Sequence, residues 1–227
     1  MTWSIQLVSS TLRARFTMLA YDRRADAQTV EAHADDAAAL LADAPGPALI
    51  VGSSFGGVIA LDVLRRYPGA CAGAVLVEPP LAPNDDAPPG PAEFLPAYDR
   101  IVETQGGPAA AEMFLRTVLG DSELELMPRR TRERTVAMWR QIRSDSAALI
   151  AYRPRYAELS TLRTPIRLLG GGRSAAHFRP TLEALRAALP SSTIEIFESA
   201  GHMLHAEAPR RFAEILSGFA DELGLRA

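Results

Sequence analysis

Short apolar runs bounded by turn residues recur along this chain of 227 residues, and they constrain its fold more than any other feature. Their brevity and their content of branched side chains predict buried parallel strands. The runs are FTMLAY (16–21), ALIVG (48–52), GAVLVE (73–78), IRLLG (166–170) and TIEIF (193–197). Helical patterns alternate with them, at 28–42, 55–67, 179–189 and 209–223. This alternation predicts an α/β fold, a mostly parallel sheet with flanking helices.

The alternation is interrupted between residues 79 and 163. The interruption begins with the proline-rich stretch PPLAPNDDAPPGP, in which neither a helix nor a strand can continue. Helical patterns follow near 93–105, 108–119, 131–143 and 145–152. We therefore expect one α/β core made of 1–78 and 164–227, with 79–163 inserted at the carboxyl edge of the sheet as a helical lid, or cap.

Composition limits the class of partner. The formal net charge of -3 leaves no basic excess with which to bind nucleic acid. Cys71 is the single cysteine, and the histidines lack paired carboxylates or thiols at metal-ligand spacing, so we expect no disulfide, metal or cofactor. No apolar run approaches the ~18 residues of a membrane span, and the chain does not begin like a signal peptide. We expect a cytoplasmic protein that acts on a small molecule and binds no membrane.

Ser54 lies in the pattern Gly-x-Ser-x-Gly, between an expected strand and an expected helix. In that context the pattern is typical of a nucleophile elbow, a strained turn that raises the serine hydroxyl above the sheet. Gly52 and Gly56 would give room where the strand and the helix cross. The N–H of Phe55, at the helix start, would be one oxyanion donor. A plain glycine-rich turn is the alternative, whereas a phosphate-binding loop is disfavoured because no Lys-Ser or Lys-Thr pair follows the glycines.

His202 is the predicted general base. It follows Gly201 directly after the last expected strand, and Pro209 opens the next helix at a position that tolerates proline. A neutral imidazole there can take the Ser54 proton and return it to a leaving group. The other histidines are His205, a competitor on the same turn; His177, in the loop after IRLLGGG, as a pocket or plain loop residue; and His33, expected on a solvated helix face.

The chain resembles the α/β-hydrolase family from about Phe16 to its C-terminus. The segments that carry the resemblance, in family order, are YDRR, VGSSFGG, VLVEPP, TPIRLLGGG and SAGHMLHAEAP. The elbow and histidine segments are the most specific of these. The resemblance implies a serine esterase-like enzyme, in which the nucleophile, an acid and the histidine follow one another along the chain.

The acid of this family is usually an aspartate just after the strand here expected at 166–170, but no acidic residue occurs in 159–182. Glu78 ends the preceding strand, and the carboxyl ends of neighbouring parallel strands open onto the same crevice. Some relatives, including haloalkane dehalogenases, take their acid from this strand end, and the VEPP segment is similar to theirs. A strand-end carboxylate that pairs with an arginine is the structural alternative. The predicted triad is Ser54, His202 and Glu78, with Glu207 and Asp99 as weaker acids.

Only fifteen residues precede the 16–21 run, where family members normally have two or three strands and a His-Gly loop that donates a second oxyanion N–H. We favour a helix here over one replacement strand. Either the true N-terminus lies upstream of Met1, or the protein dispenses with the first edge of the sheet. The second explanation exposes a strand edge, which predicts a homodimer that covers it, or an unstable protein.

The leading function is a serine hydrolase that cleaves a small to medium apolar carboxylic ester through an acyl-enzyme intermediate. The alternatives are a non-hydrolytic lyase, cyclase or acyltransferase of secondary metabolism, and a catalytically impaired binding protein. Loss of one oxyanion donor would cost ~3 kcal/mol of transition-state stabilisation. The expected pocket residues, most of which also fit a lid core, are Phe94, Tyr98, Phe114, Met138, Trp139 and His177.

Overall fold

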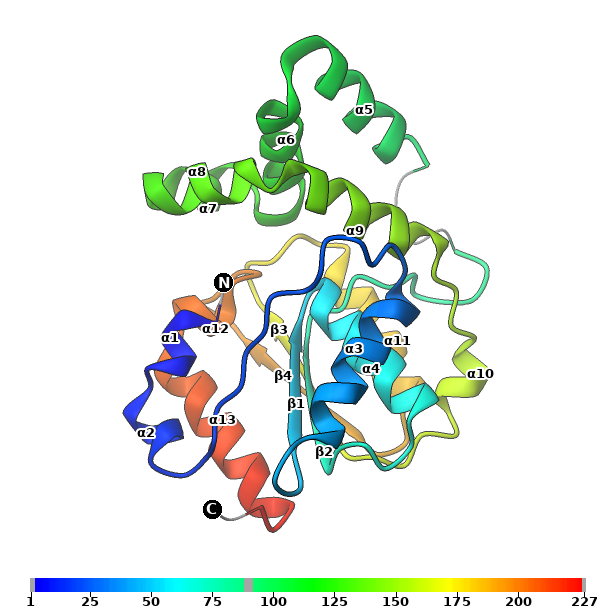
Figure 1. Ribbon diagram of the computed structural model, residues 1–227, viewed down its shortest axis with the longest axis vertical. Coiled ribbons are helices and arrows are strands. Elements are labelled where there is room, and N and C mark those ends of the chain that lie inside the picture. Colours follow the sequence, from blue (N-terminus) through cyan, green and yellow to red (C-terminus); the bar gives the residue numbers. More distant parts are fainter. Residues whose placement is uncertain (1–2, 88–91, 226–227) are drawn as a thin grey trace.

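The computed structural model describes residues 3–87 and 92–225. Its core is a four-stranded, wholly parallel sheet with the strand order β1-β2-β3-β4 (Figure 1). The strands are β1 (Leu49–Ser53), β2 (Gly73–Val77), β3 (Ile166–Gly171) and β4 (Ser192–Phe197). Each lies within one residue of its expected bounds, so the α/β fold with a parallel sheet is confirmed.

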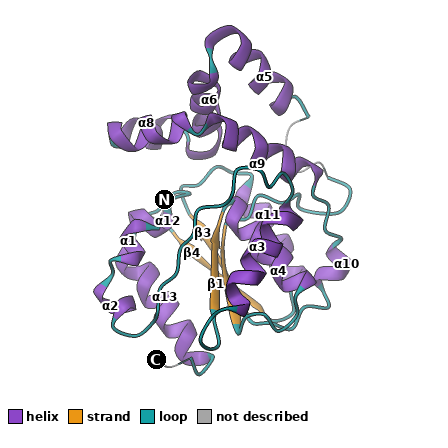
Figure 2. Cartoon of the chain, viewed as in Figure 1, coloured by secondary structure: helices purple, strands orange, loops and turns teal. Residues whose placement is uncertain are grey.

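Helices cover both faces of this sheet (Figure 2). On one side lie α3 (Val30–Ala42), α4 (Phe55–Arg66) and α11 (Phe178–Ala188). The other side carries α13 (Pro209–Glu222) and the short helices α1 (Ser4–Leu7), α2 (Ser10–Arg13) and α12 (Leu204–Glu207). The segment before residue 16 is therefore helical, as expected. Local signals explain the long helices: the Thr29 hydroxyl accepts a hydrogen bond from the Ala32 N–H at the start of α3, and Pro209 opens α13.

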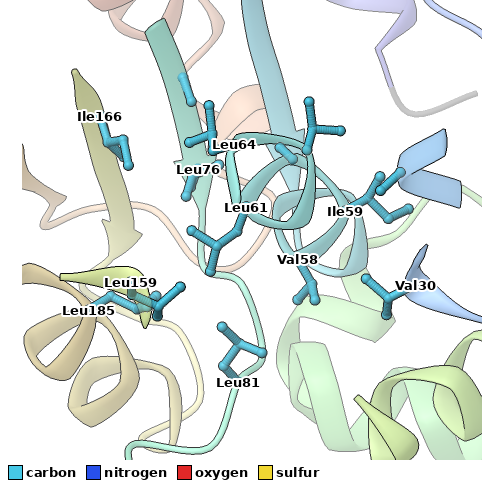
Figure 3. Packing of buried hydrophobic residues seen from close by; sticks show 14 of the residues in the cluster. Val30, Val58, Ile59, Leu61, Leu64, Leu76, Leu81, Leu159, Ile166 and Leu185 are labelled. Carbon is cyan, nitrogen blue, oxygen red and sulfur yellow. The ribbon is translucent and has the colours of Figure 1, made fainter. Parts of the chain in front are cut away.

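Strand β2 shows how the sheet separates two cores. All of its residues are buried, and neighbouring side chains point to opposite faces. Leu76 belongs to the cluster under α4 and α11, whereas Val75 and Val77 belong to the cluster under α13. The first cluster also holds most of α4, including Val58, Leu61 and Leu64 (Figure 3).

A second group of helices lies beyond the carboxyl ends of the strands (Figure 1). They are α5 (Phe94–Gln105), α6 (Gly107–Leu119), α7 (Asp121–Leu126), α8 (Arg129–Ala137) and α9 (Trp139–Ala151), and α10 (Tyr156–Leu159) returns the chain to the core. We call α5 to α9 the cap. The helix break expected near residue 144 instead falls at Met138, and α7 and α10 were not expected. Residues 88–91 of the expected lid lie outside the described residues.

The expected strand at 16–21 is wrong. Residues 16–24, hereafter the 16–24 segment, have no regular secondary structure and run as the dark blue trace in Figure 1 beside β1. Among the described residues, no backbone hydrogen bond joins this segment to β1. Its ends are held elsewhere, because Arg15 pairs with Asp221 on α13 and Arg23 pairs with Asp145 on α9. A run with strand-like composition does not form a strand without a neighbour to complete its hydrogen bonds.

The absence of a neighbour leaves β1 at the edge of the sheet. The Ser54 N–H donates to the Val77 carbonyl, and the Ala48 carbonyl accepts from the Ala72 N–H, so these residues face β2. Successive residues of a strand direct their backbone groups to alternate sides. The N–H and C=O groups of Leu49, Val51 and Ser53 therefore point to the free edge.

We expect a second copy of the chain to cover this edge, because unpaired edge groups pair readily with another chain. Sedimentation equilibrium should then show a monomer–dimer equilibrium. Hydrogen exchange should slow at the amides of Leu49, Val51 and Ser53 as concentration rises, while the Ser54 amide, already bonded to β2, serves as the reference. A monomer at every concentration whose edge amides exchange quickly would contradict this expectation.

Gly52 allows β1 and α4 to cross closely. A Cβ added at Gly52 would lie 2.2 Å from the Gly56 carbonyl oxygen, so no other residue fits there. A Cβ at Gly56 would meet nothing within 4 Å, and our expectation that Gly56 gives room at the crossing is therefore wrong. The second tight position is Gly57, where a Cβ would lie 3.2 Å from the Cβ of Pro79.

Two alanine substitutions test this difference. Gly52→Ala should lower the free energy of unfolding by about 3 kcal/mol, because backbone atoms must move. Gly56→Ala should change it by about 1 kcal/mol or less, and in the stabilising direction, because alanine favours a helix. Urea unfolding of both variants measures the two effects. Equal losses in the two variants would show that the crossing is not the constraint.

Candidate active site

Ser54 occupies a strained turn between β1 and α4. Its φ of 53° and ψ of -124° lie outside the regions that side-chain-bearing residues favour. Among the described residues, Ser54 and Glu78, with a φ of 43°, are the two non-glycine residues with positive φ. Such strain costs of order 1–3 kcal/mol and is concentrated at functional sites. The Ser54 side chain makes no capping bond to α4, so its hydroxyl is not used to stabilise the helix.

The start of α4 presents a free backbone donor beside Ser54. Phe55 is the first residue of the helix, so its N–H has no acceptor within the helix. The N–H groups of Gly57 and Val58 are already bonded to the Ser54 carbonyl. The Phe55 N–H is thus free to donate a hydrogen bond to an oxygen that becomes negative beside Ser54.

His202 lies in the loop after β4 and contacts Glu78. Its Nδ1 is 2.6 Å from the Glu78 Oε2, and both side chains are buried. The imidazole stacks on the ring of Phe178, with 4.4 Å between centroids and 15° between planes. These contacts fix the ring orientation and leave Nε2 as the nitrogen available to a partner.

Glu78 follows β2 and is 1% exposed. Its Oε1 accepts the Gly171 N–H at 2.8 Å, and its Oε2 accepts the Ser174 hydroxyl at 2.9 Å in addition to contacting His202. Burial of a carboxylate is costly unless hydrogen bonds compensate, and here both oxygens have partners. The structure therefore brings the predicted acid and the predicted base together.

The end of β3, after which the family's usual aspartate is missing, lies against Glu78 instead. A Cβ at Gly170 would be in ordinary contact with the Glu78 Oε1, at 3.5 Å, whereas a Cβ at Gly171 would lie 2.4 Å from the Gly201 carbonyl oxygen. Sequence reasoning did not identify Gly171 and Ser174 as partners of the acid. The glycine run after IRLLG was the visible signal, but it does not reveal which carboxylate fills the space.

The alternative acids lie elsewhere. Glu207 accepts the Gly201 N–H at 2.9 Å and pairs with Arg173. Asp99 pairs with Arg143 between two cap helices, at 2.6 Å. Neither carboxylate contacts the His202 ring.

The alternative histidines also differ from His202. Both ring nitrogens of His205 are buried without a hydrogen-bond partner among the described residues, and burial lowers the pKa of this imidazole to about 4. His33, expected on a solvated face, is instead 1% exposed and packs edge-on against Phe55, with centroids 5.7 Å apart. His177 packs on Phe178 at 4.2 Å. Only His202 has a carboxylate partner among these.

A large cavity, here the central cavity, joins these elements. Its volume is about 1550 Å³, above the ~300–1,000 Å³ of typical small-molecule pockets. Ser54, Phe55 and His202 line one part of it, and the cavity continues between β1 and the 16–24 segment. The cap contributes Phe94, Phe114, Ile142 and Leu149, which add apolar side chains to the wall.

Half of the expected pocket residues reach this cavity. Phe94, Phe114 and His177 line it. Tyr98 is fully buried within the cap and donates to the Trp139 carbonyl at 2.8 Å. Trp139 packs against Gly107, and Met138 is 53% exposed. These three lie away from the cavity, because amphipathic cap helices bury one face against each other. Phe178, which lines the cavity and supports His202, was not expected.

Among the described residues, no group of three His, Cys, Asp or Glu side chains could hold a metal ion. No helix in 3–87 or 92–225 has the length and apolar character needed to cross a membrane.

The sequence and the structure of this chain are similar to those of known proteins. A candidate aryl esterase from Burkholderia cenocepacia has a similar structure, with a TM-score of 0.75 and 22% sequence identity over 99% of this chain and 86% of that chain. MenH from S. aureus has a TM-score of 0.72 and 16% identity over 90% of this chain and 80% of that chain. A thermophilic esterase from Thermogutta terrifontis has a TM-score of 0.67 and 23% identity over 92% of this chain and 77% of that chain. No curated protein matches the chain significantly. The profile of the alpha/beta hydrolase family matches residues 2–215, and the chain belongs to that family.

Proposed function

We propose that this protein is a serine hydrolase that cleaves apolar carboxylic esters through an acyl-enzyme intermediate. Ser54 is the nucleophile, His202 the general base and Glu78 the orienting acid. One observation carries the proposal: a buried His202–Glu78 pair, with 2.6 Å between Nδ1 and Oε2, borders the same cavity as the strained Ser54.

The reaction follows from these positions. The Ser54 Oγ attacks the carbonyl carbon of the ester while His202 Nε2 takes the hydroxyl proton. The Glu78 carboxylate stabilises the imidazolium, and the Phe55 N–H donates to the oxygen that becomes negative. When the tetrahedral intermediate collapses, the proton passes from His202 to the departing alkoxide. Water then repeats the sequence on the acyl-enzyme, releases the carboxylic acid and restores Ser54.

The apolar cavity wall favours substrates with apolar groups on either side of the ester. Two of the similar structures are a candidate aryl esterase and a thermophilic esterase, which agrees with this class. One observation favours the two alternatives to hydrolysis. These are a non-hydrolytic enzyme, which would be a lyase, cyclase or acyltransferase, and a catalytically impaired binding protein. The described residues before the 16–24 segment form short helices, and no His-Gly loop is present to donate a second hydrogen bond to an oxyanion.

A fluorophosphonate label and a p-nitrophenyl ester separate these candidates. We expect the wild-type protein to be labelled on Ser54 and to hydrolyse p-nitrophenyl butyrate, and Ser54→Ala to lose both activities. Ser53→Ala removes the adjacent hydroxyl and should keep the label. Labelling without hydrolysis would favour the non-hydrolytic enzyme, and neither signal would favour the binding protein.

Replacement of the acid tests the triad itself. Glu78→Gln should lower kcat about 10³-fold or more, because an amide cannot stabilise the imidazolium or fix its tautomer. The melting temperature should fall only slightly, since a glutamine oxygen can still accept the Gly171 N–H. Asp99→Asn, in the cap, is the matched control and should leave kcat unchanged. Near-normal turnover by Glu78→Gln would remove this residue from the mechanism.

A further inference from the structure

The central cavity extends along the whole length of β1. Ser54 lines it just after the carboxyl end of this strand, and Pro47 and Leu49 line it at the amino end. A strand rises about 3.3 Å per residue, so about 16 Å of strand separates Leu49 from Ser54. The cavity therefore reaches much further from the serine than a short acyl group would.

One part of the cavity, here the edge arm, has a wall of apolar side chains. They come from the 16–24 segment, β1 and α13, and they belong to the hydrophobic cluster under α13. These cavity-lining side chains are Phe16, Met18, Leu49, Val51, Phe212 and Leu216. Because they share one cluster, the wall of the edge arm is a continuous apolar surface beside β1.

The side chains of β1 are less buried than those of the neighbouring strand. All residues of β2 are buried, whereas Leu49, Ile50 and Val51 of β1 are half-buried. Helices cover both faces of the sheet (Figure 2), but β1 borders the central cavity, which leaves these side chains accessible to water. Transfer of such apolar surface from water to an apolar ligand is favourable, so the edge arm provides affinity for an apolar chain.

The arginines beside the edge arm offer no free positive charge. Arg15 and Arg23 line the cavity near the two ends of the 16–24 segment. Arg15 pairs with Asp221, and Arg23 pairs with Asp145. An anionic group on a ligand would have to compete with these carboxylates, which favours a neutral ligand in the edge arm.

We infer that the edge arm binds the acyl chain of a long-chain fatty acid ester while the ester carbonyl lies at Ser54. The inference rests on the proposed function and names its substrate class. An extended acyl chain of about twelve carbons matches the ~16 Å of strand beside it. After Ser54 attacks and the alcohol departs, the acyl chain stays in the edge arm until water releases the fatty acid.

The edge arm and the free backbone edge of β1 are different surfaces. The side chains of a strand point to the two faces of the sheet, whereas its backbone hydrogen-bonding groups lie in the plane of the sheet. The N–H and C=O groups of Leu49, Val51 and Ser53 therefore need no contact with the acyl chain. They remain available to water or to a second copy of the protein.

The alternative is that the cap holds the acyl chain. Phe94 and Phe114 of the cap also line the central cavity, and a chain bound there would likewise favour long esters. A variant that fills only the edge arm distinguishes the two sites. Met18→Trp is suitable, because Met18 is half-buried in the wall of the edge arm and lies in a segment without regular secondary structure.

The experiment measures kcat/KM of wild-type protein, Met18→Trp and Val8→Trp on p-nitrophenyl butyrate, octanoate and dodecanoate, each below its critical micelle concentration. Val8 is 70% exposed and lies outside the cavity, so Val8→Trp is the matched control. We expect wild-type kcat/KM to rise about twofold or more for each added methylene, because each one buries more apolar surface. Met18→Trp should lower the ratio of dodecanoate to butyrate kcat/KM about tenfold or more, and Val8→Trp should keep the wild-type ratio.

A second measurement locates the acyl chain without a substitution in the edge arm. Ser54 is labelled with a fluorophosphonate whose dodecyl chain carries two bromine atoms, which quench a tryptophan that they contact. Trp3 packs against Phe212 of the edge arm, with 6.0 Å between centroids, whereas Trp139 lies in the cap away from the cavity. We expect the label to quench Trp3, observed in Trp139→Phe, and to leave Trp139, observed in Trp3→Phe, unquenched.

The outcomes separate this inference from the proposed function. Wild-type hydrolysis of butyrate without a gain for longer esters would overturn the inference alone, and so would an unchanged ratio in Met18→Trp. If Met18→Trp fails to fold, the bromine label decides, and an unquenched Trp3 overturns the inference. A wild-type protein that neither reacts with the fluorophosphonate nor cleaves any of these esters would overturn the proposed function and this inference with it.

Discussion

The site depends on one buried carboxylate. Glu78 accepts hydrogen bonds from Gly171, the last residue of β3, and from Ser174 in the following loop, and it contacts His202 after β4. Three strand ends therefore meet at a single side chain. A buried charge is tolerated only when its hydrogen bonds are complete, so each partner constrains the others. The orientation of the His202 imidazole therefore depends on the positions of all three strand ends.

Much of this arrangement could be predicted from the sequence, because it follows from chain order and parallel strands. The elbow around Ser54, a histidine after the last strand and an acid at the end of β2 all lie at carboxyl ends, which open onto one crevice. Ser174 could not be predicted, because its hydroxyl reaches Glu78 through the path of an irregular loop. Tyr98 and Trp139 show the same limit: helical periodicity identifies an apolar face but not the surface that it contacts.

The 16–24 segment illustrates a different limit. Its composition favours a strand, but strand formation needs a neighbour that only the rest of the fold can provide. Leu19, expected to be buried, is 69% exposed. Ion pairs at Arg15 and Arg23 instead fix the segment to α13 and α9. Local propensity was outweighed by tertiary contacts that depend on charge and position rather than on periodicity.

The size of the central cavity has a thermodynamic consequence. A space of about 1550 Å³ that water-sized molecules can enter leaves the apolar side chains of its wall in contact with solvent. An apolar molecule that displaces this water binds the folded chain and not the unfolded one, and it therefore stabilises the fold by mass action. The resistance of the protein to heat then depends on what the cavity holds.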